Sequence, residues 1–581
     1  MKKVKILSLS FFSDVWQHSY SEFKVLDTLN KKKILVDYLT CEKDFSYCPA
    51  MENQHLSNNS ETYKKNIVCN RCMKNSQFYL KKSNFNNIKL KENVSKNEEK
   101  KIKSILKKVT KKNFLKLKVL GITVGKYALF NFLISQKLST THFNDNQFKL
   151  YLKDIENCLM ALFAVKNILK KKKYDYIQAY STEYSINKVC TEYANLKGVK
   201  VRTVISGKQT LSKYQYFKIA EGNGHGHNWH AIAKWKSFKK VPLQKESLEL
   251  FSEYLTSSLK SQIYMNYSKE AKNLDIKNFF KIHESYKNIV LVAMSSMDER
   301  VGDFYLGIRE TSEKKCFSKV FKNDLEWLKY LVDFTKKFPD TFFIVRPHPR
   351  DYPSKRNKNI ANSINFFTNI KDQFPKNAVL DTPDNEISIF DYIPYISLLL
   401  HSSSSLSYDF GVFGVPSLTY DKDLYRYEND LTFYPSKFSE YENTFKDILY
   451  KKKFDKKKII VNSFRWLILQ LNYEFVNIKE VFPFKLNNLF FRALYFLLVK
   501  VSKGHYMIHI LYYLFNKKIK NRHIFNEIIL KKYKSVFDYT LKNKNFRNDN
   551  DKNLKKEFNF CKTFMLNNLN SNLKIFYEKI S

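Results

Sequence analysis

The feature that most constrains the fold is an alternation of short apolar runs with helical patterns along the 581-residue chain. Residues 3–11 have the composition of a β-strand, residues 21–33 that of a helix and residues 34–41 that of a second strand. Strand, helix and strand follow one another again over residues 174–207. Consecutive parallel strands need a crossover helix between them, so the alternation predicts a parallel sheet covered by helices.

A second alternating block begins near residue 285. A strand is expected over residues 286–296, an amphipathic helix over residues 321–339 and a further strand over residues 341–349. Asn323 is a suitable N-cap for that helix. Shorter strands are expected over residues 378–381, 396–402 and 416–421. The chain is therefore expected to be an α/β protein with two Rossmann-like, doubly wound domains that face a cleft, and ligands should bind beyond the carboxyl ends of the strands.

We expect the first domain over residues 1–284 and the second over residues 285–450. The first contains an insertion rich in Cys, Asn and Lys at about residues 42–115. Residues 451–581 are expected to form a basic, aromatic helical extension. Its residues 464–501 either lie on an anionic membrane face or pack on the two domains. The apolar stretch over residues 489–515 is interrupted by cations, so no transmembrane helix is expected.

The N-terminus has too short an apolar core for a signal peptide and is better interpreted as the first strand. The expected location is therefore the cytoplasm, with peripheral attachment to the inner face of the cytoplasmic membrane as an alternative.

The chain is strongly basic, with 101 Lys and Arg residues against 56 Asp and Glu residues and a formal net charge of +45. Such an excess favours anionic partners, which include nucleic acids, membranes and phosphorylated substrates. The cations are spread over the whole chain and no RNA- or DNA-binding module is visible, so nucleic acid is not an expected partner. Much of the charge is also consistent with ordinary solvated surfaces.

Four of the eight cysteines lie close together near the N-terminus, with C-x6-C and C-x2-C spacing. They are Cys41, Cys48, Cys69 and Cys72. Two interpretations stay open, which are a structural zinc site with four thiolate ligands and free thiols that pack in the core. In the absence of an export signal the thiols are expected to be reduced.

The strand over residues 341–349 ends in Arg-Pro-His-Pro-Arg, which places Arg346, His348 and Arg350 at alternate positions. The two prolines restrict φ and keep the preceding residues extended, so the three side chains form a row at the carboxyl end of the strand. Arg grips phosphate with a planar fork, and His can donate a hydrogen bond or change charge near neutrality. The motif predicts a phosphate-binding site, and the alternative is a stiff loop whose cations face water.

A second motif, HSSSSLSYDFGVFGVP over residues 401–416, follows another strand. Its serines are Ser402, Ser403, Ser404 and Ser405. Serine hydroxyls and the free N–H groups of a first helical turn can bind an anion. Asp409, in the same short helix, can accept hydrogen bonds from ribose or sugar hydroxyls. The alternative is that the serines cap the helix and Asp409 favours its dipole.

Together these two stretches resemble the bacterial capsule and surface polysaccharide biosynthesis glycosyltransferases, which have the two-domain GT-B fold. That family shows a strand that ends in Arg-x-His-Pro and, later, a Ser/Thr cluster, a Glu and Gly-x-Pro. The matching residues are Arg346, His348, Pro349, Ser404, Ser405, Gly414 and Pro416. Asp409 stands where the family usually has Glu, and Asp298 matches an Asp that follows the first strand of the second domain. The resemblance covers residues 286–421.

The resemblance implies a glycosyltransferase that moves a sugar from a nucleotide-sugar, held by the second domain, to a growing surface glycan or a lipid-linked glycan, held by the first. It implies that no catalytic metal or other cofactor is required. Basic side chains and a helix N-terminus would stabilise the leaving phosphate. An acidic or His residue would remove the proton of the attacking hydroxyl.

The richest candidate for this base is the Gly-spaced stretch EGNGHGHNWH over residues 221–230, with Glu221, His225 and His227. A metal site and an ordinary turn are the alternatives for this stretch. The other candidates for the base are Asp298, Asp14 and His18, and Glu299 is expected to neighbour the donor.

Two other functions stay open. A transferase of alcohol phosphates from a CDP-polyol would use the same scaffold and similar phosphate-binding clusters. A basic protein without catalytic activity that binds glycan or nucleic acid is the other alternative.

Overall fold

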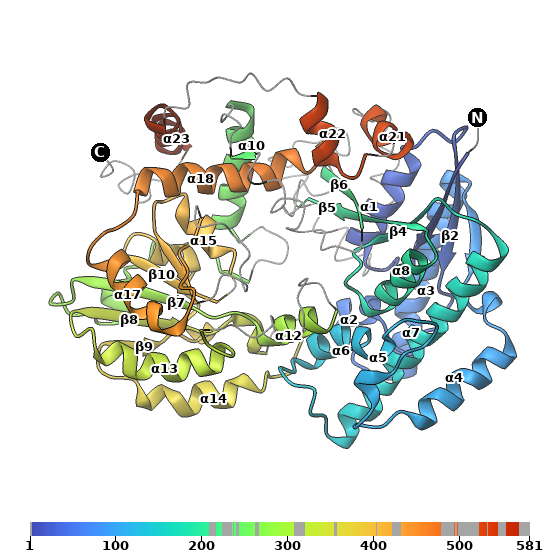
Figure 1. Cartoon of the computed structure of the whole chain (residues 1–581), viewed down its shortest axis with the longest axis horizontal. Helices are drawn as coiled ribbons and strands as arrows, with labels where there is room; N and C mark the ends of the chain where they lie inside the picture. Colours follow the sequence, from blue (N-terminus) through green and yellow to red (C-terminus); the bar gives the residue numbers. More distant parts are fainter. Residues whose placement is uncertain are drawn as a thin grey trace.

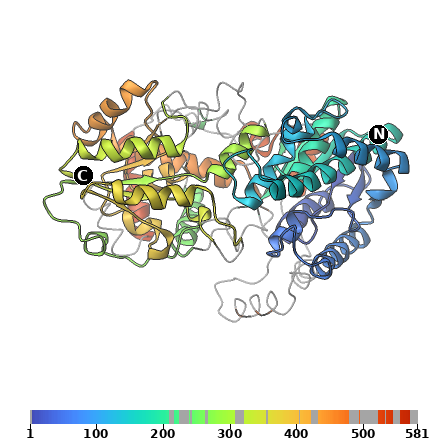
Figure 2. The ribbon, with the colours of Figure 1, turned by 90° about the horizontal axis from the view of Figure 1, so that it is seen from below.

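The computed structural model contains two α/β domains, which lie side by side (Figure 1, Figure 2). Each domain is built on a β-sheet of its own. The structure describes residues 3–207, 216–222, 235, 238–239, 243, 245–261, 267–306, 320–353, 357–402, 404–420, 431–477, 493, 497, 522–531, 533–543 and 554–568.

The first domain contains a seven-stranded sheet with the strand order β12-β6-β5-β4-β1-β2-β3. Its strands are β1 (Val4–Leu9), β2 (Ile34–Thr40), β3 (Asn86–Lys89), β4 (Tyr176–Tyr180), β5 (Lys200–Ser206), β6 (Tyr216–Glu221) and β12 (Val476–Asn477). The first five are parallel to one another, and β6 and β12 add antiparallel pairs at one edge. The parallel strands predicted from both strand–helix–strand units of this domain are therefore confirmed.

Helices cover both faces of this sheet. Successive residues of β1 point to opposite faces, so that Leu7 and Leu9 lie in one buried cluster and Ile6 lies in another. The first face is covered by α6 (Leu129–Gln136), α7 (Asp145–Lys171) and α8 (Ser185–Leu196). The second is covered by α1 (Trp16–Asp27), α21 (Arg522–Leu530) and α22 (Val536–Asn543). This arrangement is doubly wound.

Residues 42–115, expected as an insertion, contribute to the same sheet. They include α2 (Pro49–Asn53), α3 (Thr62–Ser83) and α4 (Lys96–Lys108). The strand β3 pairs in parallel with β2, where Asp37 lies opposite Asn86. The segment therefore supplies the strand at one edge of the sheet.

The second domain contains a five-stranded parallel sheet with the order β11-β10-β7-β8-β9. Its strands are β7 (Asn288–Ala293), β8 (Thr341–Arg346), β9 (Ala378–Leu380), β10 (Leu398–His401) and β11 (Ser417–Thr419). Its helices include α12 (Met297–Tyr305), α13 (Asp324–Lys336), α14 (Ser363–Ile370), α15 (Leu406–Gly411) and α17 (Phe438–Leu449). Asn323 caps α13 as predicted, because its side chain accepts the N–H groups of Leu325 and Glu326.

The C-terminal region connects the two domains. The helix α18 (Lys456–Ile468) packs beside α10 (Lys245–Leu259) and α15 in a core of the second domain. The chain then reaches the first domain, where β12 pairs with β6 and the helices α21 and α22 join a buried cluster. It finally returns to α18 through α23 (Leu554–Asn568) (Figure 1).

The architecture is therefore GT-B-like, with two Rossmann-like α/β domains and a C-terminal region rich in helices. In the part of the chain that the structure describes, none of the helices combines the length and the apolar character that crossing a bilayer requires.

A buried ion pair fixes the crossing of the C-terminal region to the first domain. The Nζ of Lys218, on β6, lies 2.5 Å from Oε2 of Glu474, two residues before β12, and both side chains are at most 2% exposed. Removal of one partner leaves a buried charge uncompensated, at a cost of about 3–5 kcal/mol. We therefore expect Lys218→Met to lower the midpoint of urea-induced unfolding clearly.

The matched control is Lys269→Met, which breaks the exposed pair of Lys269 with Glu386. An exposed pair contributes little to stability. Equal and small effects of the two substitutions on the unfolding midpoint would contradict the role given to Lys218.

Candidate functional site

The register of the second sheet brings the two sequence motifs to one edge. Ala293, the last residue of β7, lies opposite Arg346 of β8 on one side and opposite His401 of β10 on the other. Neighbouring strands are about 4.8 Å apart, so the two motif-bearing strands end about 10 Å from each other. This edge is the carboxyl edge of a parallel sheet, where ligands of such folds bind.

Arg346 is held by partners within its own domain. Its Nη1 donates to Oδ2 of Asp381 at 2.8 Å and its Nη2 donates to the carbonyl oxygen of Ile387 at 2.7 Å. The guanidinium also lies over the ring of Tyr392, and the residue is 8% exposed. Arg346 therefore fixes the chain that follows β9 against β8, and its contact with a phosphate stays a prediction.

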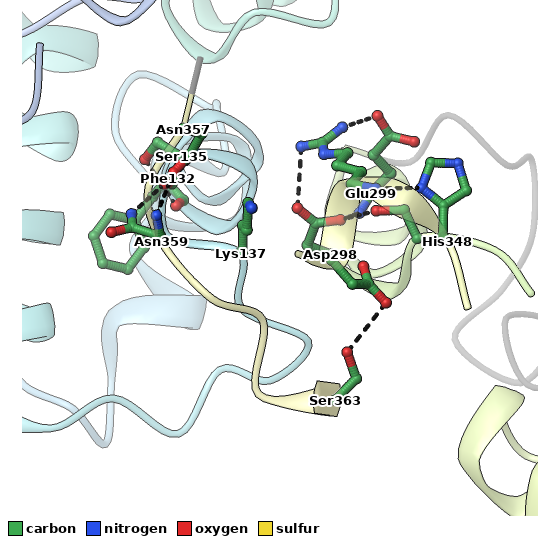
Figure 3. A network of polar contacts seen from close by, with 12 residues as sticks. Phe132, Ser135, Lys137, Asp298, Glu299, His348, Asn357, Asn359 and Ser363 are labelled. Atoms are coloured by element: carbon green, nitrogen blue, oxygen red, sulfur yellow. Dashed lines mark hydrogen bonds and ion pairs between the residues drawn. The ribbon is translucent and has the colours of Figure 1, made fainter. Parts of the chain in front are cut away.

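Arg350, Asp298 and Glu299 form an ion-pair network, and Figure 3 labels its two acidic residues. The Nη2 of Arg350 donates to Oδ2 of Asp298 at 3.0 Å, and its Nη1 contacts the carboxylate of Glu299. The other oxygen of the buried Asp298 accepts the N–H of Glu299 at 2.8 Å. The network joins the loop after β8 to the first turn of α12. Asp298 thus has a positioning contact, and its catalytic role stays a prediction.

His348 lies between these two arginines. Its Nδ1 accepts the backbone N–H of Arg350 at 3.2 Å, and its ring meets the edge of Tyr267. Burial lowers the pKa of His348 to about 4, against the opposing effect of the nearby carboxylates. The imidazole is therefore neutral at pH 7, so it can donate or accept a hydrogen bond there but contributes no charge.

The serine motif has a buried and an accessible part. Ser402 is fully buried, and its Oγ lies 2.9 Å from both Oγ of Ser295 and Oδ2 of Asp324. Ser404 is half-buried and accepts the N–H of Leu406 at 3.3 Å, whereas Ser405 is exposed. Ser403 lies outside the described residues. Among the described serines of the motif, Ser404 and Ser405 have the accessible hydroxyls.

The end of the motif is shaped by packing. Asp409, on α15, accepts a hydrogen bond from the hydroxyl of Tyr254 at 3.1 Å. Gly414 has a left-handed backbone, with φ of +76°, and a Cβ there would lie 2.6 Å from Cε of Lys456 on α18. The left-handed backbone favours glycine at this position, and the side chain of Lys456 leaves little space for a Cβ. The glycine of the Gly-x-Pro part is thus explained by its backbone conformation and its closeness to α18.

Asp324 organises the site, although the sequence did not single it out. This carboxylate, which is fully buried at the start of α13, accepts the N–H of Ser295 at 3.1 Å and the hydroxyl of Tyr420 at 2.7 Å. It also contacts Ser402 and the guanidinium of Arg300. Its place directly after the N-cap Asn323 was the only available signal.

The first domain also reaches this edge. Lys137, the residue after α6, is 3% exposed, and its Nζ donates to the carbonyl oxygen of Tyr352 at 2.6 Å. The amide groups of Asn357 and Asn359 donate to the carbonyl oxygen of Ser135 at 3.0 and 2.7 Å (Figure 3). Burial and the charge of Arg350 lower the pKa of Lys137 to about 8. These contacts tie the loop after β8 to the first domain.

The candidates for the base lie at different places. Glu221 is opposite Arg202, near the amino end of β5, and its carboxylate pairs with Lys200 at 3.2 Å. It therefore lies toward the sheet edge that faces away from the carboxyl ends, and its catalytic role stays a prediction without support from this position. His225 and His227 lie outside the described residues.

Asp14 and His18 follow β1 and lie at the carboxyl edge of the first sheet. Arg71 forms a two-point ion pair with Asp14. The ring of His18 stacks on that of Tyr180, with the centroids 3.8 Å apart, and with Ser10 and Glu22 it lines a cavity of about 10 Å³, which is about the size of one water molecule. Of these candidates, His18 lies at the carboxyl edge of the sheet and also lines a cavity.

The four N-terminal cysteines are free thiols. The thiols of Cys41, Cys69 and Cys72 each interact electrostatically with Cys48, so the four gather in one place. Burial raises the pKa of Cys48 to about 12, which disfavours its thiolate. Among the described residues no group of three or more His, Cys, Asp or Glu side chains has an arrangement that holds a metal ion. The zinc site stays a prediction.

The buried imidazoles predict a dependence of stability on pH. Burial holds the pKa of His401 near 3 and that of His348 near 4, both below the ordinary value of about 6.5. The unfolded chain therefore binds more protons than the folded chain as the pH falls from about 6.5 to 4, and stability is lost across that window. We expect His348→Gln to lose less stability than the wild type between pH 7 and pH 5 in urea unfolding. An equal loss in both proteins would contradict the low pKa of His348.

The contact of Lys137 with Tyr352 predicts how the loop after β8 responds to a substitution in the other domain. A buried hydrogen bond from a charged group contributes about 1.5–3 kcal/mol, so Lys137→Met should make amide hydrogen exchange of residues 346–353 roughly tenfold faster or more. Lys371→Met, at an exposed position of the second domain, should leave that exchange unchanged. Hydrogen-exchange mass spectrometry measures both, and unaltered exchange in Lys137→Met would contradict the role of this contact.

Comparison with known proteins gave structural neighbours alone, because no family model and no curated protein matches the chain. UDP-GlcNAc 2-epimerase from Neisseria meningitidis bound to UDP-GlcNAc shows 12% identity and a TM-score of 0.23, with 81% of this chain and 99% of that chain covered. KpsC beta Kdo 2,4 transferase from Thermosulfurimonas dismutans shows 9% identity and a TM-score of 0.29, with 50% and 79% covered. The spinosyn rhamnosyltransferase SpnG complexed with spinosyn aglycone shows 9% identity and a TM-score of 0.24, with 80% and 96% covered. TM-scores this low support no inference about this chain, and its fold is assigned from its own strand order.

Proposed function

We propose that the chain is a glycosyltransferase, which moves a sugar from a nucleotide-sugar bound by the second domain to a surface glycan or lipid-linked glycan bound by the first. The observation that carries this proposal is the register at Ala293, because it brings the ends of the Arg-Pro-His-Pro and serine motifs to one carboxyl edge. The resemblance of these motifs to polysaccharide biosynthesis glycosyltransferases supplies the reaction class.

The contacts divide the motif residues into two groups with different proposed roles. Arg346, Arg350 and Ser402 have buried partners and hold the loops in place. Ser404 and Ser405 are accessible, and His348 is a neutral donor or acceptor, so these three are the proposed contacts of the donor phosphates. This assignment narrows the set of phosphate ligands that the motifs alone suggested.

The acceptor side of the proposal rests on the first domain. His18 lies at the carboxyl edge of its sheet beside a cavity and is the proposed proton acceptor for the attacking hydroxyl. We propose that the reaction needs no metal cofactor, as the family resemblance implies. The net charge of +45 suits an acceptor presented at an anionic membrane surface, to which the protein would attach peripherally from the cytoplasm.

A thermal-shift screen tests the donor site. The full chain is heated with CMP-, CDP-, UDP-, GDP- and dTDP-linked sugars, and with CDP-glycerol to include transfer of an alcohol phosphate. We expect one nucleotide class to raise the melting temperature, because a ligand at about 100 times its Kd stabilises the folded state by about 2.7 kcal/mol. Ser404→Ala should reduce this shift, since it removes an accessible hydroxyl without breaking a buried pair.

The matched control is Ser285→Ala, because Ser285 is an exposed serine before β7, at the amino edge of the same sheet. Its variant should keep the full shift. Arg346→Ala is less suitable, because it would leave the buried Asp381 without its ion-pair partner. If no nucleotide stabilises the wild type, or if both serine variants lose the shift equally, the proposed donor site is wrong.

A further inference from the structure

A cavity of about 220 Å³ lies at the junction of the two domains. The first domain contributes the hydroxyl residues Ser139, Thr140 and Thr141, which follow α6. The second domain contributes one face of α12 and the two residues that precede α13. Both domains therefore supply walls of one cavity, which is partly open to solvent.

The cavity is distinct from the edge that carries the sequence motifs. It is lined by Met297, Val301 and Phe304, which recur at spacings of four and three residues and so share one face of α12. Glu299 projects from another side of the same helix, where it contacts Arg350 of the loop after β8 (Figure 3). The helix α12 thus separates the cavity from the proposed donor site.

The polar groups in the cavity can recognise hydroxyls and a negative charge. In the described part of the chain, the hydroxyls of Ser139 and Thr141 have no hydrogen-bond partner, although both side chains are half-buried. The guanidinium of Arg300 is 12% exposed; its Nη1 bonds to Tyr420 at 3.0 Å and contacts Asp324. The exposed Lys322 adds a second cation at the wall, and the described residues offer its ammonium group no carboxylate.

The rest of the lining is apolar and aromatic. Phe304 and Tyr305 present rings, and Met297 and Val301 present aliphatic groups. Aromatic rings pack well against the apolar C–H face of a pyranose, while hydroxyls and cations bind its polar rim. The volume corresponds to about seven water molecules at about 30 Å³ each. It is smaller than the about 300–1,000 Å³ of pockets for drug-sized ligands, so a single sugar fits it better than a whole nucleotide-sugar does.

We propose that this cavity is a binding site for an anionic monosaccharide of the hexose phosphate class, separate from the donor site. Thr141 and Ser139 of the first domain bind sugar hydroxyls, and Lys322 with Arg300 of the second domain binds the phosphate. Because the ligand contacts both domains, it binds most tightly when they are docked. Its binding therefore favours the docked arrangement, in which Lys137 contacts the loop after β8.

Isothermal titration calorimetry on the full chain tests this site, with glucose 1-phosphate as the probe and with glucose and inorganic phosphate as comparison ligands. We expect saturable binding of glucose 1-phosphate that is at least tenfold tighter than that of either comparison ligand. Thr141→Val, which keeps the side-chain shape, and Lys322→Gln should each weaken binding about tenfold or more. Melting curves of the free variants establish that both are folded, and Lys322→Gln, at an exposed position, is the variant safest from misfolding.

Two further variants make the assignment specific. Lys371→Gln removes an exposed lysine elsewhere in the second domain, and Ser404→Ala alters the proposed donor site; both should bind glucose 1-phosphate as the wild type does. Absence of binding overturns the proposal, and so does equal affinity for inorganic phosphate. Loss of binding in Ser404→Ala with full binding in Thr141→Val assigns the ligand to the donor site and also overturns it. Failure of every nucleotide-sugar to bind would contradict the proposed function, but it would not affect the result for glucose 1-phosphate at this cavity.

Discussion

The second domain depends on the buried carboxylate of Asp324. A carboxylate without water is costly unless donors surround it, and here the N–H of Ser295, the hydroxyl of Tyr420, Ser402 and Arg300 do so. These partners follow β7, β10 and β11 or belong to α12, so one side chain at the start of α13 fixes the relative positions of three strand ends. The serine motif starts from this fixed edge, and the loop after β8 is attached to it through α12. Both oxygens of this carboxylate have protein partners, so its role is to hold the strand ends in place.

Two contacts help to hold the domains together at their junction. The end of α6 meets the loop after β8 through Lys137, while α12 packs on α6 so closely that a Cβ at Gly302 would lie 3.0 Å from the ring of Phe130. The first contact involves the loop that carries the Arg-Pro-His-Pro motif, and the second involves α12. The position of the first domain is therefore coupled to the shape of the edge where the donor is proposed to bind, and the cavity beside α12 lies at the same junction.

Much of the fold could be predicted from local sequence patterns, whereas most pairings of the site could not. The alternation of strands and helices, the N-cap Asn323 and the place of both motifs at strand ends depend on neighbouring residues, and the structure confirms them. The ion-pair partner of Arg346 is Asp381, which directly follows β9. The hydrogen-bond partner of Lys137 lies in the other domain. Glu221 begins a glycine-rich stretch, a pattern that favours a binding loop. Its strand runs antiparallel to β5, a fact of tertiary pairing that reverses the edge it reaches.

The path of the C-terminal region has a consequence for the order in which the protein can fold during synthesis. Ile219 and Val536 belong to one buried cluster of the first domain, although more than half of the chain separates them. At about 5–20 residues per second, a ribosome needs on the order of tens of seconds to make the intervening chain. One apolar face of the N-terminal sheet therefore stays incompletely covered until the whole second domain has been synthesised. Chaperones can bind that face during this interval.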